Sequence, residues 1–363
     1  MHSSLDAQAG PKPPAAAREP RVSLLMPNRD NADVLELTLG RLAEHTTYRE
    51  VELIVVDDGS TDASREILRR WRDSGRFREL RLIEREHGGV VEALNAGLEA
   101  ATGELVVQLD ADASIETPGW LERMVAFFCS DARVGAITAK VVFDHGEVHA
   151  CGIEVIGPRG LHDRGTEPTE PAGRRTSHQR VLRFREGACM ACDRPAEVDG
   201  GIGCCLMFRR ETALAVGGYD PGFSPVWFDD LDLTLSIRRH GLKVFFFPEV
   251  RVVHHLGRRN LSPGQRAAAR ARSLARALLP RRGAARLIQA LDLDRPPREH
   301  RERLAHHYAY WREKWGFDLV NPDMDAVRAR WGETEICWRY DPAMRAEGER
   351  IAAAFGARGS PLV

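Results

Sequence analysis

Apolar and polar residues follow two alternating patterns along the first part of the chain. Short, mostly β-branched apolar runs predict strands at 22–26, 53–56, 80–83, 105–109 and 134–142. Between these runs, apolar residues spaced three or four positions apart predict helices at 32–44, 63–72, 90–101 and 119–128. Apolar strands that alternate with helices favour a mainly parallel α/β sheet with helices on both of its faces.

This alternation stops at residue 144 and resumes after residue 200. Glycine, proline and charged residues are abundant from 144 to 200, which predicts an irregular insertion or lid. The pattern then predicts strands at 202–208 and 243–247, with one helix from Arg210 and another across 230–239.

Composition narrows the class of protein. Of the 363 residues, 43% are apolar and 29% are charged, as is typical of a globular protein. A net charge of −1 gives no broad basic field, so we expect no nucleic-acid partner. No apolar run reaches the roughly 18 residues that a membrane-spanning helix needs. The first 20 residues lack the apolar core of a signal peptide, and the seven cysteines are an odd number. These features favour a cytoplasmic protein with reduced thiols.

Three parts of the chain follow from these patterns. Residues 1–20, rich in alanine and proline, predict a disordered lead-in. Residues 21–257 contain the strands and helices of the sheet domain. Residues 258–363 turn to arginine and alanine and then to aromatic residues, which predicts a helical appendage.

Ligands of such sheets bind at the carboxyl ends of the strands, so the residues there are candidates for a site. The first strand ends in Pro27-Asn28-Arg29-Asp30, and the second in Asp57-Asp58-Gly59-Ser60. Two carboxylates do not suit a loop that cradles phosphate, but Asp58 suits acceptance of an N–H from a base or of a ribose hydroxyl. The alternative is a helix N-cap, which Ser60 or Thr61 would supply alone.

The fourth strand leads into Asp110-Ala111-Asp112. Two carboxylates two residues apart on a turn can both reach one hard cation, and a diphosphate would supply further oxygen ligands. Ahead of this turn, Gly88-Gly89 offers close backbone approach and Asn95 offers an amide to a ligand. The alternative for these three residues is a tight turn and an asparagine on a helix face.

Two further groups lie downstream. Asp230 opens a helix beside Trp227 and Phe228, where a water-poor environment would raise its pKa and suit it to act as a general base. Its alternative role is that of a partner for the helix dipole. His254-His255 follows an apolar run, and one imidazole would complete a metal site. Without further information such a histidine pair is more often structural.

Together, seven elements resemble the inverting glycosyltransferases of family 2, which have the GT-A fold, a Rossmann-like mixed sheet. In order, these elements are 22–28, 54–62, 95–97 with 102–104, 109–112, Gly217-Gly218-Tyr219-Asp220, the helix start at 229–233, and His254 within an H-x-x-G pattern. The resemblance runs from residue 22 to about residue 257, with a weaker echo in Lys314-Trp315-Gly316.

The resemblance implies a nucleotide-diphosphate sugar as donor and a hydroxyl of a carbohydrate, lipid-linked or other acceptor. It also implies Mn²⁺ or Mg²⁺ as cofactor. By position, the donor-binding residues are Pro27, Arg29, Asp58, which reaches the base, Gly89, Asn95, Asp110 and Ala111. Asp112 matches the principal metal ligand, with Asp110 and His254 beside it. Asp230 matches the catalytic base.

Two positions depart from the family pattern. Arg29-Asp30 stands where the family often has Tyr–Asn, and Asp229 stands where it usually has Glu. Residues 149–152 and 201–210 resemble, more loosely, the subgroup that adds sugars such as rhamnose to bacterial surface polysaccharides.

Two other interpretations remain. A sugar nucleotidyltransferase also places acidic residues and a metal at strand ends, but its first strand is normally followed by a glycine-rich loop. A zinc-organised binding module would use Cys189-x-x-Cys192 with Cys204 or Cys205. Adjacent residues of a strand face opposite sides, so only one of the latter two cysteines could join such a site.

The segment 258–291 contains nine arginines and no Asp, Glu or Lys. Within it, Ala267, Ala271, Leu274 and Leu278 fall at helical spacing. Such a helix fits peripheral contact with an anionic membrane at the cytoplasmic face, or with the phosphate of a lipid-linked acceptor. The alternative is that its apolar stripe packs on the sheet domain.

Overall fold

The computed structural model describes residues 19–156, 162–163, 190–255 and 298–356, with single positions at 271, 274, 278, 279, 283 and 287. The predicted lead-in up to residue 18, Cys189 and all nine arginines of 258–291 lie outside the described residues. Among the described helices, none combines the length and apolar character needed to cross a bilayer.

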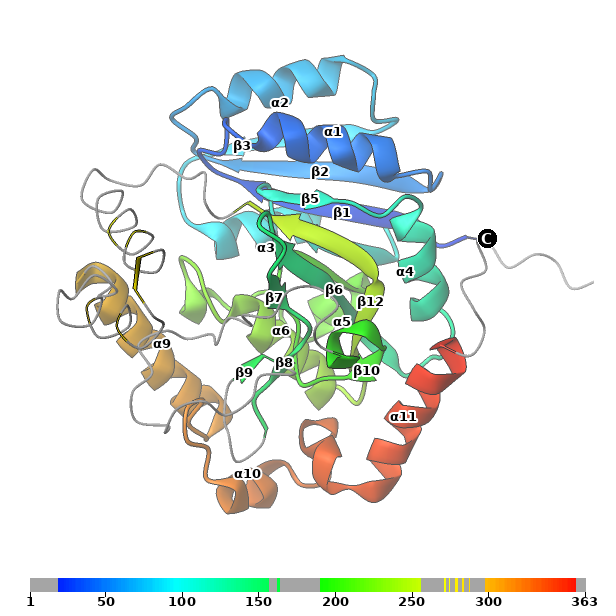
Figure 1. Cartoon of the computed structure of the whole chain (residues 1–363), viewed down its shortest axis with the longest axis vertical. Helices are drawn as coiled ribbons and strands as arrows, with labels where there is room; N and C mark the ends of the chain where they lie inside the picture. Colours follow the sequence, from blue (N-terminus) through cyan, green and yellow to red (C-terminus); the bar gives the residue numbers. More distant parts are fainter. Residues whose placement is uncertain are drawn as a thin grey trace, which may run out of the picture.

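A ten-stranded mixed sheet forms the centre of the molecule (Figure 1). Its parallel part consists of β3 (Leu80–Arg85), β2 (Val51–Asp58), β1 (Val22–Asn28) and β4 (Leu105–Leu109), in that spatial order. The antiparallel strand β11 (Cys205–Arg209) then joins β4 to β6 (Val134–Phe143). Next to β6 lies the parallel strand β12 (Lys243–His254), followed by the antiparallel strand β10 (Ala196–Glu197).

Helices cover both faces of this sheet because its central strands are apolar on both sides. On one face, α1 (Leu35–His45), α2 (Ser64–Asp73) and α4 (Trp120–Phe128) share a core with Leu24 and Leu53. On the other face, α3 (Val90–Ala100), α5 (Arg210–Ala215) and α6 (Asp229–Arg239) pack against the neighbouring residues Leu25 and Ile54. This alternation along β1 and β2 is the expected consequence of the strand period of two. The predicted α/β class is confirmed.

Two predicted segments differ from the structure. Strand β12 extends seven residues beyond the predicted end at Phe247, past Pro248 to His254. A register shift between Phe247 and Arg251 accommodates the proline, which has no N–H to donate to a neighbouring strand. The described parts of 144–200 are also more regular than a lid, because β7 (Val148–Ala150) pairs with β6 and β10 pairs with β12.

From residue 298 to residue 356 the chain is mostly helical. Helices α9 (Arg298–Trp315), α10 (Met324–Trp331) and α11 (Pro342–Gly356) lie around the end of the molecule opposite α2 (Figure 1). The 3₁₀ helix η4 (Glu335–Tyr340) packs on α6, and α11 packs on β10. The segment Lys314-Trp315-Gly316, which weakly resembles the family pattern, contacts α6. Lys314 Nζ and Trp315 Nε1 donate to Asp232 at 2.8 and 2.9 Å.

Candidate active site

A cavity of about 790 Å³ opens where the sheet strands end. It collects residues from the end of β2, from the loops after β1, β3 and β4, from the start of α6 and from the end of β12. Nearly all of the site residues predicted from the sequence line it: Pro27, Arg29, Asp58, Gly89, Asp110, Ala111, Asp112, Asp230 and His254. Segments separated by more than 200 residues therefore meet at one place.

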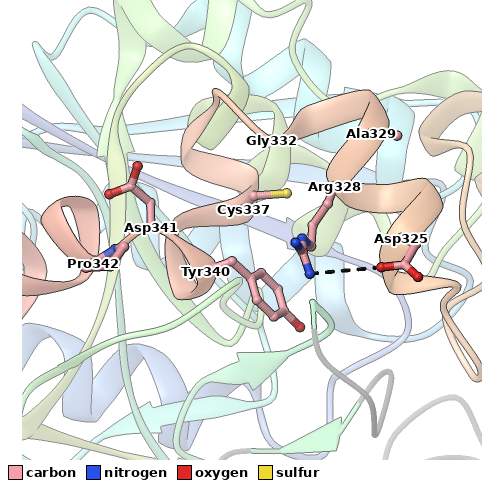
Figure 2. Close-up of a pocket in the computed structure, with 8 residues that line it drawn as sticks. All are labelled: Asp325, Arg328, Ala329, Gly332, Cys337, Tyr340, Asp341 and Pro342. Atoms are coloured by element: carbon pink, nitrogen blue, oxygen red, sulfur yellow. Dashed lines mark ion pairs between the residues drawn. The ribbon is translucent and has the colours of Figure 1, made fainter.

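A smaller cavity of about 460 Å³ lies in the appendage, between α10 and the start of α11 (Figure 2). Its charged contact is the ion pair of Arg328 with Asp325 at 3.9 Å. Tyr340 and Asp341 border it. None of the described strands ends at this smaller cavity, so we place the candidate active site in the larger one.

Asp58 is buried beside the larger cavity and holds the loop that follows β3. Its carboxylate accepts hydrogen bonds from the N–H groups of Gly88 and Gly89 at 3.0 and 2.8 Å. Arg85 and His87 contact it at 2.9 and 2.7 Å. Burial alone would raise the pKa of Asp58, but the bonds from Gly88, His87 and Gly89 lower it below its ordinary value. Asp58 is therefore a carboxylate whose bonds order the cavity wall.

Gly89 lies where the loop before α3 contacts the loop before α6. Its φ of +115° lies in a region that favours glycine, and a Cβ built there would lie 2.5 Å from Cβ of Pro225. The next residue, Val90, donates its N–H to the carbonyl of Pro225 at 2.8 Å. The loop before α3 thus packs directly on the loop that leads into α6.

Asn95 lies outside the cavity lining. Its side-chain amide donates to the carbonyl of Tyr219 at 2.7 Å and accepts from the N–H of Tyr219 at 2.9 Å. These bonds hold α3 against the chain before α6, which corresponds to the structural alternative raised for this residue. We therefore leave Asn95 out of the proposed donor-binding residues.

Asp110, Asp112 and His254 converge at the cavity. The short strand β5 (Ala113–Ile115) pairs with β12 and sets Ala113 opposite His254, which brings that histidine beside Asp112. His254 Nε2 lies 3.2 Å from Asp112 Oδ1 and 4.0 Å from Asp110 Oδ2. One ligand atom from each of the three residues lies within 4.8 Å of the others. Two carboxylates and one imidazole fit a hard divalent cation such as Mn²⁺ or Mg²⁺.

Asp229 and Asp230 begin α6 after a sharp turn in which Trp227 and Phe228 have φ of 83° and 66°. Asp230 Oδ2 accepts from Gly203 N–H at 2.9 Å, and its Oδ1 accepts from Leu231 N–H at 2.7 Å. Burial outweighs these two bonds and raises the pKa of Asp230 to about 6. Burial and the charge of Asp230 raise the pKa of Asp229 well above its ordinary value. Asp230 is therefore mostly ionised at neutral pH, and burial disfavours the ionised form of Asp229.

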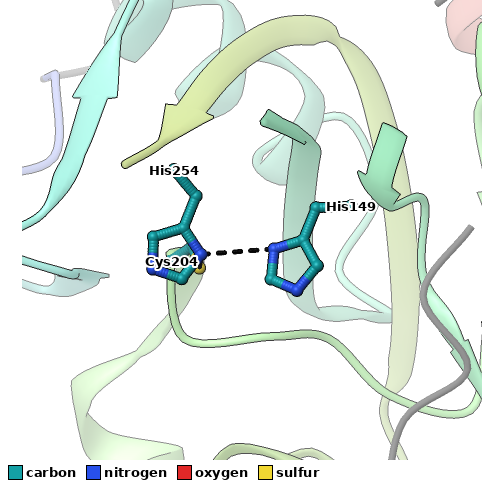
Figure 3. Close-up of side chains that lie close together, drawn as sticks. All are labelled: His149, Cys204 and His254. Atoms are coloured by element: carbon teal, nitrogen blue, oxygen red, sulfur yellow. Dashed lines mark hydrogen bonds between the residues drawn. The ribbon is translucent and has the colours of Figure 1, made fainter. Parts of the chain in front are cut away.

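Three residues that the sequence did not single out for this site also line the cavity. Arg303 comes from α9, so the appendage contributes to the wall. His149 and Cys204 lie beside His254, at the ring edge that faces away from Asp112 (Figure 3). Burial and the neighbouring His254 lower the pKa of His149 to about 3, so its imidazole is neutral. No local pattern marks these residues, because strand pairing brings them together.

Comparison with known proteins gives one family. The model described as "Glycosyl transferase family 2" matches residues 23–213. The chain is 32% identical over 241 residues to uncharacterized protein y4gI of Sinorhizobium fredii, a match covering 65% of this chain and 24% of that protein. It is 28% identical over 240 residues to O-antigen biosynthesis protein RfbC of Myxococcus xanthus, covering 65% and 17%.

A third relative is validoxylamine A glucosyltransferase of Streptomyces hygroscopicus, at 33% identity over 140 residues, covering 38% of this chain and 29% of that protein. The chain thus spans less than a third of the length of these curated relatives. Among solved structures, mannosyltransferase PcManGT from Pyrobaculum calidifontis, in complex with GDP-Man and Mn²⁺, aligns at a TM-score of 0.46 and 20% identity. That alignment covers 94% of this chain and 87% of the other.

Proposed function

Because the chain belongs to glycosyl transferase family 2, we propose that it transfers a sugar, with inversion, from a nucleotide-diphosphate sugar to an acceptor hydroxyl. One observation carries this proposal. A set of carboxylates and an imidazole suited to a divalent cation and a carboxylate suited to act as a base face the same cavity at the strand ends. That pairing is what displacement of a diphosphate by a hydroxyl requires.

The donor would lie against the loops after β1 and β3. We assign Pro27, Arg29 and Gly89 to nucleotide binding, together with Asp110 and Ala111 on the turn after β4. Asp58 would set the shape of the base pocket through the bonds that fix Gly88 and Gly89. Gly89 allows a close approach because it has no side chain to occupy the space.

Asp110, Asp112 and His254 would hold Mn²⁺ or Mg²⁺. A cation bound there neutralises charge on the leaving diphosphate. To serve as ligand, His254 Nε2 must carry a lone pair, which leaves the ring proton on Nδ1. The neutral His149 is placed to accept that proton in a hydrogen bond, since the two Nδ1 atoms are 3.2 Å apart.

Asp230 would act as the base. Its pKa of about 6 leaves it ionised at neutral pH, yet basic enough to accept the proton of an acceptor hydroxyl. The acceptor oxygen then bonds to the anomeric carbon as the bond from that carbon to the diphosphate breaks. Attack on the side opposite the leaving group inverts the anomeric centre. Burial disfavours the ionised form of the adjacent Asp229.

We further propose a hexosyl or deoxyhexosyl donor and a role in bacterial polysaccharide, glycolipid or glycoconjugate synthesis. The name of one relative, an O-antigen biosynthesis protein, supports this assignment. The family match favours transfer of a sugar over the nucleotidyltransferase alternative. Of the cysteines named for a zinc-organised module, Cys189 lies outside the described residues, and Cys205 contacts Met124 in the core at 3.8 Å.

A cytoplasmic enzyme in peripheral contact with an anionic membrane fits this role, and two leucines support it. Leu274 and Leu278, which belong to the predicted apolar stripe, are 60% and 70% exposed. We expect sedimentation of the wild-type protein with vesicles that contain anionic lipid at low salt. Leu274→Ser with Leu278→Ser should weaken it, because less apolar area enters the interface. Leu37→Ser, an exposed leucine on α1, is the control. Equal sedimentation of all three proteins would contradict the assignment.

A thermal-shift experiment tests the proposed function. Nucleoside diphosphates should raise the melting temperature more with Mn²⁺ than without it, because a ligand that binds only the folded state stabilises that state. Asp112→Asn should abolish the Mn²⁺-dependent part, since a neutral amide cannot balance the cation. Asp325→Asn, which lies outside the larger cavity, should respond like wild type. If no nucleoside diphosphate shifts the wild-type melting temperature under either condition, the donor assignment is wrong.

A further inference from the structure

The imidazole of His254 has chemically different neighbours on its two edges. Its Nε2 faces Asp112 Oδ1 at 3.2 Å, the side proposed for Mn²⁺ or Mg²⁺. Its Nδ1 lies 3.2 Å from His149 Nδ1 and 3.4 Å from Cys204 Sγ (Figure 3). One ligand atom from each of these three residues lies within 4.8 Å of the others. The three side chains are buried, and all of them line the cavity from which a cation would enter.

The spacing of these atoms matches a tetrahedral zinc site. Zinc binds imidazole nitrogen at about 2.0–2.1 Å and thiolate sulfur at about 2.3 Å. Tetrahedral angles then place two nitrogens about 3.3 Å apart and a nitrogen about 3.6 Å from a sulfur. The observed separations of 3.2 and 3.4 Å are close to both values. A thiolate with two imidazoles favours zinc or cobalt over Mg²⁺ or Mn²⁺, which prefer oxygen ligands.

The fold supplies these ligands from three separate strands. His149 lies in β7, His254 ends β12, and Cys204 directly precedes β11. Adjacent residues in an extended chain face opposite sides, so Cys205 contacts Met124 in the core while Cys204 faces the cavity. A site with three protein ligands leaves a fourth position open toward the cavity, as in zinc sites that also bind water or substrate.

We propose that His149, Cys204 and His254 form a second cation site that binds Zn²⁺ and excludes the cation of the Asp110–Asp112 site. A neutral imidazole has one lone pair, so His254 can serve one cation at a time. With Zn²⁺ on Nδ1, the ring proton sits on Nε2 and donates to Asp112, the usual carboxylate partner of a zinc-bound histidine. The Cys204 proton is released to solvent on binding. Zn²⁺ therefore inhibits the transferase, a consequence that rests on the proposed function.

Cobalt binding tests the zinc site without reference to catalysis. The metal-free protein is titrated with Co²⁺ and observed by near-ultraviolet and visible absorption, where a thiolate ligand produces a charge-transfer band. We expect the band in wild type and its loss in Cys204→Ser. Cys205→Ser is the matched control and should keep it, because Cys205 faces the core. A band that persists in Cys204→Ser, or its absence from wild type, overturns the site.

A second variant covers the case in which Cys204→Ser does not fold. His149→Gln should bind Zn²⁺ at least about tenfold more weakly than wild type, since even changes beyond the ligands cost that much. His145→Gln, an exposed histidine near β7, is its control. Equal Zn²⁺ affinity of both variants and wild type overturns the assignment of His149 as ligand.

Competition with Mn²⁺ separates this inference from the proposed function. Electron paramagnetic resonance detects free Mn²⁺ in a solution of the protein. If the sites share His254, adding one equivalent of Zn²⁺ releases bound Mn²⁺, and Asp112→Asn binds Zn²⁺ without binding Mn²⁺. If Mn²⁺ stays bound in the presence of Zn²⁺, the exclusion is wrong. If wild type binds no Mn²⁺ but still gives the cobalt band, the proposed hard-cation site fails and the zinc site stands.

Discussion

Two groups of buried charged residues in this molecule differ in the signs of their charges. The balanced cluster, Glu197, Arg238, Lys243 and Glu335, joins α6 and β12 to η4 of the appendage. Arg238 donates to Glu197 at 2.9 Å and Lys243 donates to Glu335 at 3.0 Å. Arg238 also donates to the carbonyls of Val198 and Glu335. Each carboxylate thus has a buried cation beside it, and Arg238 and Lys243 are fully buried.

The acidic cluster, Asp110, Asp112, Asp229 and Asp230, collects charge of one sign. Burial raises the pKa of Asp230 to about 6 and that of Asp229 well above its ordinary value, and the charge of Asp110 adds to both effects. Opposite charges repay part of the cost of burial and serve to join elements, whereas gathered like charges add repulsion to that cost. The comparison indicates that a chain retains destabilising like charges where they serve to bind a cation or to transfer a proton.

Removing one cation should convert the balanced cluster into a destabilised one. Arg238→Met leaves Lys243 as the fully buried cation beside Glu197 and Glu335, with the partly exposed Arg133 also contacting Glu335. We expect the free energy of unfolding to fall by about 3–5 kcal/mol, as when one partner of a buried ion pair is lost. Urea denaturation measures this loss. The control is Arg239→Met on the exposed side of α6, which stacks over Trp315 and should cost no more than about 1 kcal/mol. Similar losses in both variants would remove the distinction between the clusters.

Within the acidic cluster, the two adjacent carboxyls should differ in importance. Asp230→Asn should lower kcat at least about 10²-fold, the usual contribution of a general base, and keep donor affinity within a few-fold. Asp229→Asn should cost much less, because burial already disfavours the charged form of Asp229. Steady-state kinetics and donor titration compare the two. A larger loss of kcat in Asp229→Asn would transfer the role of base to that residue.

The pH dependence of kcat/KM should report the acidic cluster alone. The base must be ionised, so activity falls as pH drops through the pKa of Asp230, about 6 in the metal-free protein. Below that pH the decline should approach tenfold per unit, and above it activity should level off. A bound cation would lower this pKa and move the decline to more acidic pH. Kinetics between about pH 5 and 8 measure it. A flat wild-type profile would argue against Asp230 as the base.

The sequence predicted those parts of the site that depend on local pattern. Asp58, Asp110 and Asp112 follow directly from where buried apolar strands end, so their place at the cavity could be inferred before any pairing was known. The strands themselves were predictable because each one coincides with a separate apolar run in the sequence. Their order, with antiparallel β11 between β4 and β6, depends on contacts between distant segments.

The parts that were not predicted depend on strand register and on the appendage. The strand was predicted to end before Pro248, so the sequence did not indicate the continuation of β12 that places His254 beside Asp112. The meeting of His149 with Cys204 depends on the pairing of β7 with β6 and of β11 with β4. Arg303 reaches the cavity because α9 is anchored at Asp232, and no residue near Arg303 in sequence indicates this.

The anchoring of the appendage also bears on how this chain is inherited. The family match ends at residue 213, before Asp230, His254 and the two cations of the balanced cluster. A segment exchanged between proteins at that boundary would carry Asp110 and Asp112 without Asp230. A segment ending at residue 257 would separate Asp232 from Lys314, and Arg238 and Lys243 from Glu335. The smallest unit that can pass intact between larger proteins therefore runs from β1 through η4. Within that unit, the residues at positions 197, 238, 243 and 335 should vary together rather than one at a time.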